Sequence, residues 1–227
     1  MANDNLFTAL SKLPASAQFP TNIGEKAKGF VDREFAESKR FLIVTGYSSL
    51  EYMITFFNQV DLEPKEKVKV VLGNEPLFRQ LQKTFRTTNL RQEITDYWLD
   101  QHIAAYLCWP VINLIENIKA GKVDFRILDK LHAKIYVGDE SAMLGSSNFS
   151  QSGLVHQFEA NIRVTKEERS TDYEDMASIA NHYFEKGQDA NAFMIGLLQQ
   201  LLRLVTWKEA LARAVGEILE GDFIRND

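Results

Sequence analysis

The segment Leu131-His-Ala-Lys-Ile-Tyr-Val-Gly-Asp139 decides the fold, because polar and apolar side chains alternate along it as they do in a β-strand. A period of two places His132, Lys134 and Tyr136 on one face of that strand. The apolar residues between them are expected to face a core on the other side. Two groups that can act on a substrate therefore share one surface.

The residues after this segment are expected to complete a hairpin. Asp139-Glu-Ser141 has the composition of a turn, and Ala142–Ser146 can return as the partner strand. The return brings three polar residues back towards the first strand: Ser146, Ser147 and Asn148. Gly145 offers no side chain where a phosphate oxygen would need to approach the backbone.

Phe158–Val164 alternates in the same manner and predicts a further strand. Its apolar residues are expected to face inward, namely Phe158, Ala160, Ile162 and Val164. Glu159 and Asn161 then lie on the opposite side, where Glu159 could reach a histidine ring.

At these residues the chain resembles the phospholipase D superfamily, whose signature is H-x-K, four residues, D, about six residues and G-S-x-N. The matching residues are His132, Lys134, Asp139, Gly145, Ser146 and Asn148. One departure is visible, since five residues separate Asp139 from Gly145. The continuation Ser147–Leu154, with Glu159 downstream, is most similar to the nuclease branch of that family, which includes metal-independent restriction endonucleases and domains attached to helicases.

The residue types fit the chemistry of phosphodiester cleavage. A neutral imidazole is a nucleophile near pH 7, which makes His132 the candidate attacking group. Lys134 and Asn148, with Ser146 or Ser147, can stabilise the growing charge on the non-bridging oxygens. Glu159 can orient the ring. Asp139 is expected to hold the hairpin rather than to donate a proton.

The resemblance also implies a second histidine. In the family, two copies of the motif meet, so that one histidine attacks and the other protonates the leaving group. This chain contains a single copy of the motif. We therefore expect a homodimer with a shared active site at its interface.

The order of apolar segments predicts an α/β fold, a phospholipase D-like mixed sheet flanked by helices with a C-terminal helical segment. Arg40–Tyr47 and Glu66–Leu72 read as strands joined by a helix that ends near Gln59, which is a parallel βαβ unit. Lys122–Leu128 is a strand that leads into the hairpin. The site is therefore expected at the edge of the sheet.

Four further helices are predicted, and they divide the chain. Their ranges are Gly24–Ser38, Asn89–Ala120 with a kink at Pro110, Thr171–Glu185, and Asn191 to about Glu220. The last has too many apolar residues for one narrow stripe, so it should pack on the body or a partner. We expect a catalytic domain over 1–188 and a C-terminal helix over 189–227.

Composition limits the choice of partner and compartment. The net charge of −5 means that any nucleic-acid surface must be a local patch. Candidate basic positions are Lys65, Lys67, Lys69, Arg79, Lys83, Arg86, Arg91, Lys122, Arg126 and Lys130. The single cysteine excludes an internal disulfide, and neither a signal peptide nor an apolar span is evident, so a cytoplasmic location without membrane contact is expected.

The leading hypothesis is a metal-independent DNA nuclease module in a restriction or helicase-linked defence system. Neither metal-ligand spacing nor a nucleotide-binding loop is present in the sequence, so no metal or cofactor is expected. DNA site recognition or a helicase motor would come from another domain or partner. The alternatives are a phospholipid phosphodiesterase and a non-catalytic dimerisation or DNA-docking module.

Overall fold

A seven-stranded mixed sheet forms the centre of the computed structural model, which describes residues 18–20, 27–73, 90–101 and 103–204. In spatial order the strands are β6 (Asn161–Thr165), β5 (Ser141–Gly145), β4 (Ile135–Val137), β1 (Arg40–Thr45), β2 (Lys67–Leu72), β3 (Val123–Ile127) and β7 (Gln188–Asp189). The predicted α/β class, with a mixed sheet between helices, is confirmed.

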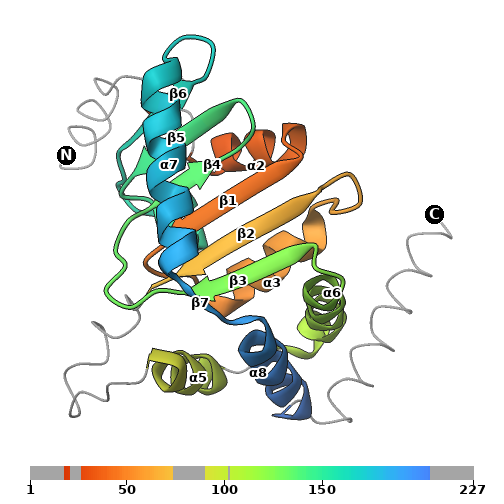
Figure 1. Ribbon diagram of the computed structural model, residues 1–227. Coiled ribbons are helices and arrows are strands. Elements are labelled where there is room, and N and C mark those ends of the chain that lie inside the picture. Colours follow the sequence, from red (N-terminus) through yellow and green to blue (C-terminus); the bar gives the residue numbers. More distant parts are fainter. Residues whose placement is uncertain (1–17, 21–26, 74–89, 102, 205–227) are drawn as a thin grey trace, which may run out of the picture.

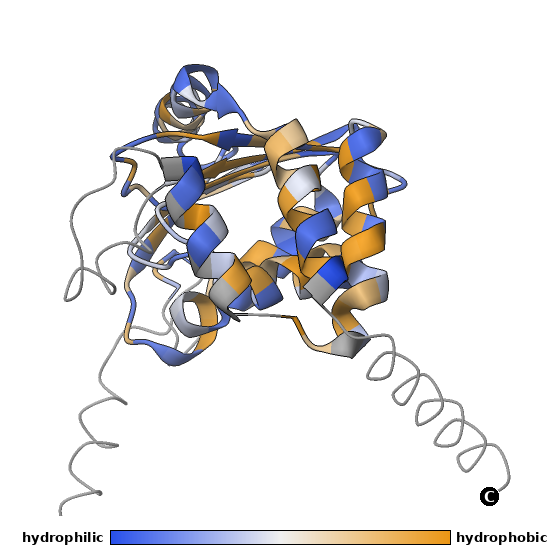
Figure 2. Cartoon of the chain, turned by 90° about the horizontal axis from the view of Figure 1, so that it is seen from below, coloured by the Kyte–Doolittle hydropathy of each residue, from blue (hydrophilic) through white to orange (hydrophobic). Residues whose placement is uncertain are grey.

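Helices cover both faces of this sheet (Figure 1). The helical elements are α2 (Ala27–Glu37), α3 (Leu50–Gln59), α5 (Leu90–Gln101), the 3-10 turn η1 (Ala105–Leu107), α6 (Cys108–Lys119), the π-helical turn η2 (Ser152–His156), α7 (Ser170–Lys186) and α8 (Asn191–Leu204). A small apolar cluster lies under α7, and a larger one lies between the opposite face and α2, α3, α6 and α8. Figure 2 shows apolar residues distributed along the helices below the sheet.

The predicted βαβ unit is confirmed, because β1 and β2 are parallel and α3 connects them. Ile43 pairs with Val70 in the larger cluster, and Val44 pairs with Val71 in the cluster under α7. A strand buried on both faces needs a continuous apolar run, which explains the absence of alternation in this segment.

The signature hairpin is present, but it is shorter than predicted and lies inside the sheet. β4 covers only Ile135–Val137 and pairs antiparallel with β5, with Ile135 opposite Leu144. On its other side β4 pairs with β1. The expectation of a site at the sheet edge is therefore wrong, since among the described strands β6 and β7 form the edges.

The prediction for the strand after Phe158 is wrong at its start, whereas Val164 near its end is buried as predicted. β6 begins at Asn161, whose side chain is buried, and Phe158 is 74% exposed. Ala160 is also exposed. Alternation at an edge strand does not determine which face is buried, because the neighbouring layer decides it.

The single long helix predicted over Asn89–Ala120 is also wrong. Two helices, α5 and α6, are separated by an irregular stretch and η1. Pro110 lies in the first turn of α6, where the missing N–H is not needed, so it begins a helix rather than kinking one.

The C-terminal helix begins where predicted. Within α8, Met194, Leu197, Leu198 and Leu201 are buried in the larger apolar cluster. The rest of the segment predicted to be helical, 205–220, lies outside the described residues. A domain boundary at 188 remains a prediction. In the part of the chain that the structure describes, no helix is long and apolar enough to cross a membrane.

Candidate active site

A cleft of about 800 Å³ opens where β1 ends and β4 begins. It is lined by most of the predicted site residues, namely His132, Lys134, Gly145, Ser146, Asn148 and Glu159. The irregular residues before β4 and the loop after β5 lie together here because β4 and β5 are antiparallel neighbours. Two motif segments that a turn separates in sequence thus meet in one cavity.

His132 and Lys134 are in direct contact. The ammonium group of Lys134 lies 3.1 Å from His132 Nε2 and donates a hydrogen bond to the carbonyl oxygen of His132 at 2.8 Å. An ammonium group can only donate, so Nε2 is the acceptor and carries the lone pair in this arrangement. Lys134 is buried and His132 is exposed. The pair therefore presents an unprotonated ring nitrogen beside a fixed positive charge.

Asn148 is held from behind by the end of β1. Thr45 Oγ1 lies 3.2 Å from Asn148 Oδ1 and accepts a hydrogen bond from the Phe149 N–H at 3.1 Å. The Asn148 side chain also lines the cleft. Gly153 packs on the other side, where a Cβ atom would lie 2.6 Å from the Asn148 carbonyl oxygen.

Glu159 accepts a hydrogen bond from Ser146. Ser146 Oγ donates to Glu159 Oε2 and accepts from the Ala160 N–H at 3.1 Å. Glu159 thereby fixes the hydroxyl of the motif serine beside the cleft. Orientation of His132 by Glu159 remains a prediction.

Ser147 does not contact the cleft, contrary to its predicted role in substrate binding. It is completely buried, and its hydroxyl accepts a hydrogen bond from Asn161 Nδ2 at 2.9 Å. Its carbonyl oxygen accepts from Tyr136 at 2.8 Å. Burial, with the nearby charges of Tyr52 and Glu159, raises the pKa of Tyr136, which keeps the phenol protonated as a donor. Ser147 therefore anchors the loop that carries its two neighbours.

Gly145 lies where β6 approaches β5 closely. A Cβ atom at this position would lie 2.5 Å from the Ala160 carbonyl oxygen and 2.6 Å from Asn161 Cα. The missing side chain allows β6 to approach β5, so the glycine serves strand packing. The approach of a phosphate oxygen at this residue remains a prediction. It still lines the cleft.

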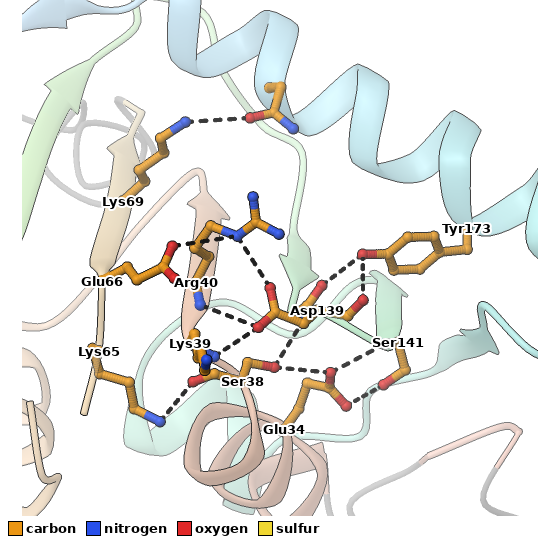
Figure 3. Close-up of polar contacts among 12 residues, drawn as sticks. Glu34, Ser38, Lys39, Arg40, Lys65, Glu66, Lys69, Asp139, Ser141 and Tyr173 are labelled. Carbon is orange, nitrogen blue, oxygen red and sulfur yellow. Dashed lines mark hydrogen bonds and ion pairs between the residues drawn. The ribbon is translucent and has the colours of Figure 1, made fainter.

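Asp139 follows β4, at the opposite end of the strand from the cleft. Figure 3 shows its polar contacts with Lys39, Arg40 and Tyr173. Its Oδ2 accepts a hydrogen bond from the Lys39 N–H at 2.7 Å, and its Oδ1 contacts Arg40 Nε at 3.3 Å. Tyr173 donates to its carbonyl oxygen at 3.1 Å. These contacts tie the hairpin to the start of β1 and to α7, which supports the structural role expected for this residue.

Several cleft residues were not predicted to belong to the site. They are Tyr47, Ser49, His156 and Gln157, together with Ser150, Gln151 and Ser152, which lie in the segment that resembles the nuclease branch but had no role assigned. His156 closes the π-helical turn η2, and Gln151 Nε2 lies 3.5 Å from His156 Nε2. Short π-helical turns are frequent at functional sites, but nothing in the sequence predicts one here.

Most predicted basic positions that the structure describes have structural partners. Lys65 donates to three backbone carbonyls at the end of α2, and Lys67 pairs with Asp124 at 2.9 Å. Arg79, Lys83 and Arg86 lie outside the described residues. Among the described side chains, no group of three or more His, Cys, Asp or Glu residues could hold a metal ion.

Comparison with known proteins identifies the domain type. A family model described as "Cardiolipin synthase, PLD-like domain" matches residues 36–182, more than half of the chain and including the whole signature. No curated protein shows a significant match to the sequence.

Several solved structures are similar to this chain at low sequence identity. Phosphatidylserine synthase of Haemophilus influenzae Rd KW20 is 12% identical with a TM-score of 0.52, over 91% of this chain and 46% of the synthase. Nuc from Salmonella typhimurium, a phospholipase D family member, is 13% identical with a TM-score of 0.44, over 77% and 97% of the chains. TrmBL2, an archaeal chromatin protein, is 14% identical with a TM-score of 0.41, over 83% and 61%. The chain spans less than two thirds of the synthase and of TrmBL2.

Proposed function

Because this chain belongs to the phospholipase D superfamily, we propose that it is a phosphodiesterase that cleaves DNA through a phosphohistidine intermediate without a metal ion. One observation carries the proposal, the 3.1 Å contact between Lys134 Nζ and His132 Nε2 in the shared cleft. The cation can bind a phosphate in the position from which the neighbouring nucleophile attacks it.

The reaction follows from the positions of these groups. When a phosphodiester enters, the Lys134 ammonium shifts its hydrogen bond from Nε2 to a non-bridging oxygen. The freed lone pair of His132 forms an N–P bond while the P–O bond to the leaving group breaks. Asn148 Nδ2 and Ser146 can donate to the non-bridging oxygens as their charge grows. Water then attacks phosphorus and gives a proton to the group that had protonated the leaving oxygen, while the N–P bond breaks and releases His132.

The leaving oxygen takes its proton from an acid on the far side of phosphorus. We propose that the acid is His132 of a second copy in a homodimer with a shared active site. His156 is the competing candidate, since it places a second imidazole in the same cleft within one chain. Both arrangements satisfy the proton requirement, and they predict different behaviour of mixed dimers.

The lining of the cleft supports a nucleic acid over a lipid substrate. Among its described lining residues there is no aliphatic side chain, whereas hydroxyl, amide and imidazole groups are frequent. Such a surface suits sugar and phosphate but offers nothing to an acyl chain. A restriction or helicase-linked context, with sequence recognition by another domain, is the setting in which we expect such a module to act.

The test is hydrolysis of DNA, RNA and phosphatidylcholine in excess EDTA, with His132→Ala as the inactive control. We expect cleavage of DNA by the wild type and none by the variant. If only the lipid is cleaved, the substrate is a phospholipid and not DNA. Activity that needs added magnesium or zinc would refute the mechanism. A folded His132→Ala protein that remains active would remove the nucleophile.

Mixing wild-type and excess His132→Ala chains under exchange conditions tests the dimer. A shared site predicts a loss of activity beyond simple dilution, because a mixed pair lacks either attack or protonation. Activity that tracks the wild-type fraction, with loss of turnover in His156→Ala, would assign the acid to His156 instead.

A further inference from the structure

A second cavity of about 420 Å³ adjoins the candidate active site and shares His132 with it. It lies on the side of the sheet covered by α7. Its walls come from the turn after β3 and from the last turns of α7, with Lys130 on one side and His182, Tyr183 and Lys186 on the other. A ligand held in the cleft can therefore extend past His132 into this groove.

The groove carries two exposed lysines. Lys130 and Lys186 both line it and are both exposed, and Asp129 is the carboxylate among its lining residues. His182 is an exposed imidazole whose ring lies 6.4 Å from that of Tyr183. The lining of the groove thus combines two positive charges with one negative charge and several hydrogen-bond donors, which suits a singly charged anion.

The backbone of Lys130 has an unusual conformation. Its φ is +60°, and among the described residues it is the only non-glycine with a positive φ. The turn is closed by a hydrogen bond from the Leu131 N–H to the Leu128 carbonyl oxygen at 3.4 Å. Glycine adopts this conformation without steric conflict, whereas a lysine does not. Strained backbone of this kind is concentrated at functional sites, and here it presents a cation at a groove that contains the nucleophile.

We propose that this groove binds the phosphate next to the scissile one on a polynucleotide strand, with Lys130 and Lys186 as its ligands. The inference rests on the proposed function and extends it, because it places the course of the substrate strand between α7 and the turn after β3. The groove acts in binding, so it should affect KM for polymeric substrates and leave the chemical step unchanged.

The experiment compares two substrates. Bis(p-nitrophenyl) phosphate has a single phosphate, whereas a short fluorescent oligonucleotide has neighbours on both sides. The variant is Lys130→Gly with Lys186→Ala, because glycine suits the positive φ and preserves the turn. The matched control is Lys28→Ala with Lys119→Ala, which removes the same charge from ion-paired lysines on α2 and α6.

For the groove variant we expect KM on the oligonucleotide to rise about tenfold or more with little change in kcat. The salt dependence of its binding should fall by about one unit of slope for each lysine lost. KM for bis(p-nitrophenyl) phosphate should not change, and the control variant should resemble wild type on both substrates. A Lys130→Arg variant that keeps Lys186 should have most of the wild-type affinity, because both positive charges are present.

Wild-type KM for the oligonucleotide in the groove variant would overturn the proposal. Loss of activity on both substrates, together with dissociation in sedimentation experiments, would overturn it too, since the groove would then be an interface between copies. If the wild-type protein cleaves neither substrate, the proposed function fails separately. Fluorescence anisotropy with the same oligonucleotide in EDTA then tests whether the groove binds the strand. Weaker binding by the groove variant alone supports the proposal, and unchanged binding refutes it.

Discussion

Two buried lysines of equal exposure allow catalytic and structural roles to be separated. Lys134 and Lys65 are each 4% exposed. Lys134 donates to one backbone carbonyl and to an imidazole that is open to solvent. Lys65 donates to the carbonyl oxygens of Phe35, Ala36 and Ser38 at the end of α2.

Replacing each lysine by methionine keeps the length of the side chain and removes the charge. A buried carbonyl that loses its hydrogen-bond donor lowers the stability by about 1–3 kcal/mol. Removing the buried ammonium group also removes its desolvation penalty, which is roughly several kcal/mol. For Lys134→Met these terms nearly cancel, so the free energy of unfolding should change by less than about 1 kcal/mol. For Lys65→Met three carbonyls lose their donor, and we expect a loss of about 2–4 kcal/mol.

Activity should change in the opposite order. Loss of one donor to a developing oxyanion lowers kcat by about 10²–10³-fold, so Lys134→Met should be nearly inactive while Lys65→Met retains its turnover. Urea denaturation and hydrolysis of bis(p-nitrophenyl) phosphate measure both quantities on the same preparations. If Lys134→Met unfolds more easily by over about 3 kcal/mol and its folded fraction turns over normally, Lys134 is structural and the proposed chemistry is wrong.

Three further outcomes can be measured. Gly145→Ala should lower stability by about 1–3 kcal/mol in urea, since the added Cβ separates β5 from β6; unchanged stability would refute that packing role. Burial of Asp124 opposes its ionisation, but hydrogen bonds from Lys67 and Asn191 outweigh it and lower its pKa, so Asp124→Asn should reduce stability by about 1 kcal/mol at neutral pH. That difference should disappear as the pH falls through the folded pKa, below about 4; a difference that persists in acid would contradict it. A substrate-labelled enzyme adduct should survive alkali and disappear in acid, whereas the reverse would indicate a carboxylate nucleophile.

The sequence was sufficient for the elements whose burial is determined locally. β1 is apolar on both faces, so its continuous apolar run predicts a central strand, and the strand–helix–strand order predicts that β2 pairs with it in parallel. The break between α5 and α6 was missed because the residues around it have helical composition, which does not show where one helix ends and the next begins. The same applies to β6, where the orientation of Phe158 depends on a neighbouring layer that alternation cannot identify.

For the site, the motif predicted which residues meet but not what each one does. His132 and Lys134 lie together as predicted, although the residues that carry them are irregular and precede β4 instead of forming part of the strand. The burial of Ser147 could not be predicted, since it depends on Asn161 and Tyr136 from two other strands. His156 carries no sequence signal, because a π-helical turn brings it to the cleft.

The distribution of charge connects these observations with the substrate. A net charge of −5 repels a polyanion at long range, so an anionic strand must be attracted locally. Lys67, Lys28 and Lys119 face carboxylates, which cancel their charge at a distance. Lys134 donates to a backbone carbonyl and lies beside His132 in the cleft. Because Lys134 is buried in the cleft with its ammonium group 3.1 Å from His132 Nε2, its attraction acts mainly on a phosphate already at His132. The protein should therefore bind its substrate weakly until the strand enters the cleft. The affinity should fall steeply with salt only when the strand also occupies the neighbouring groove.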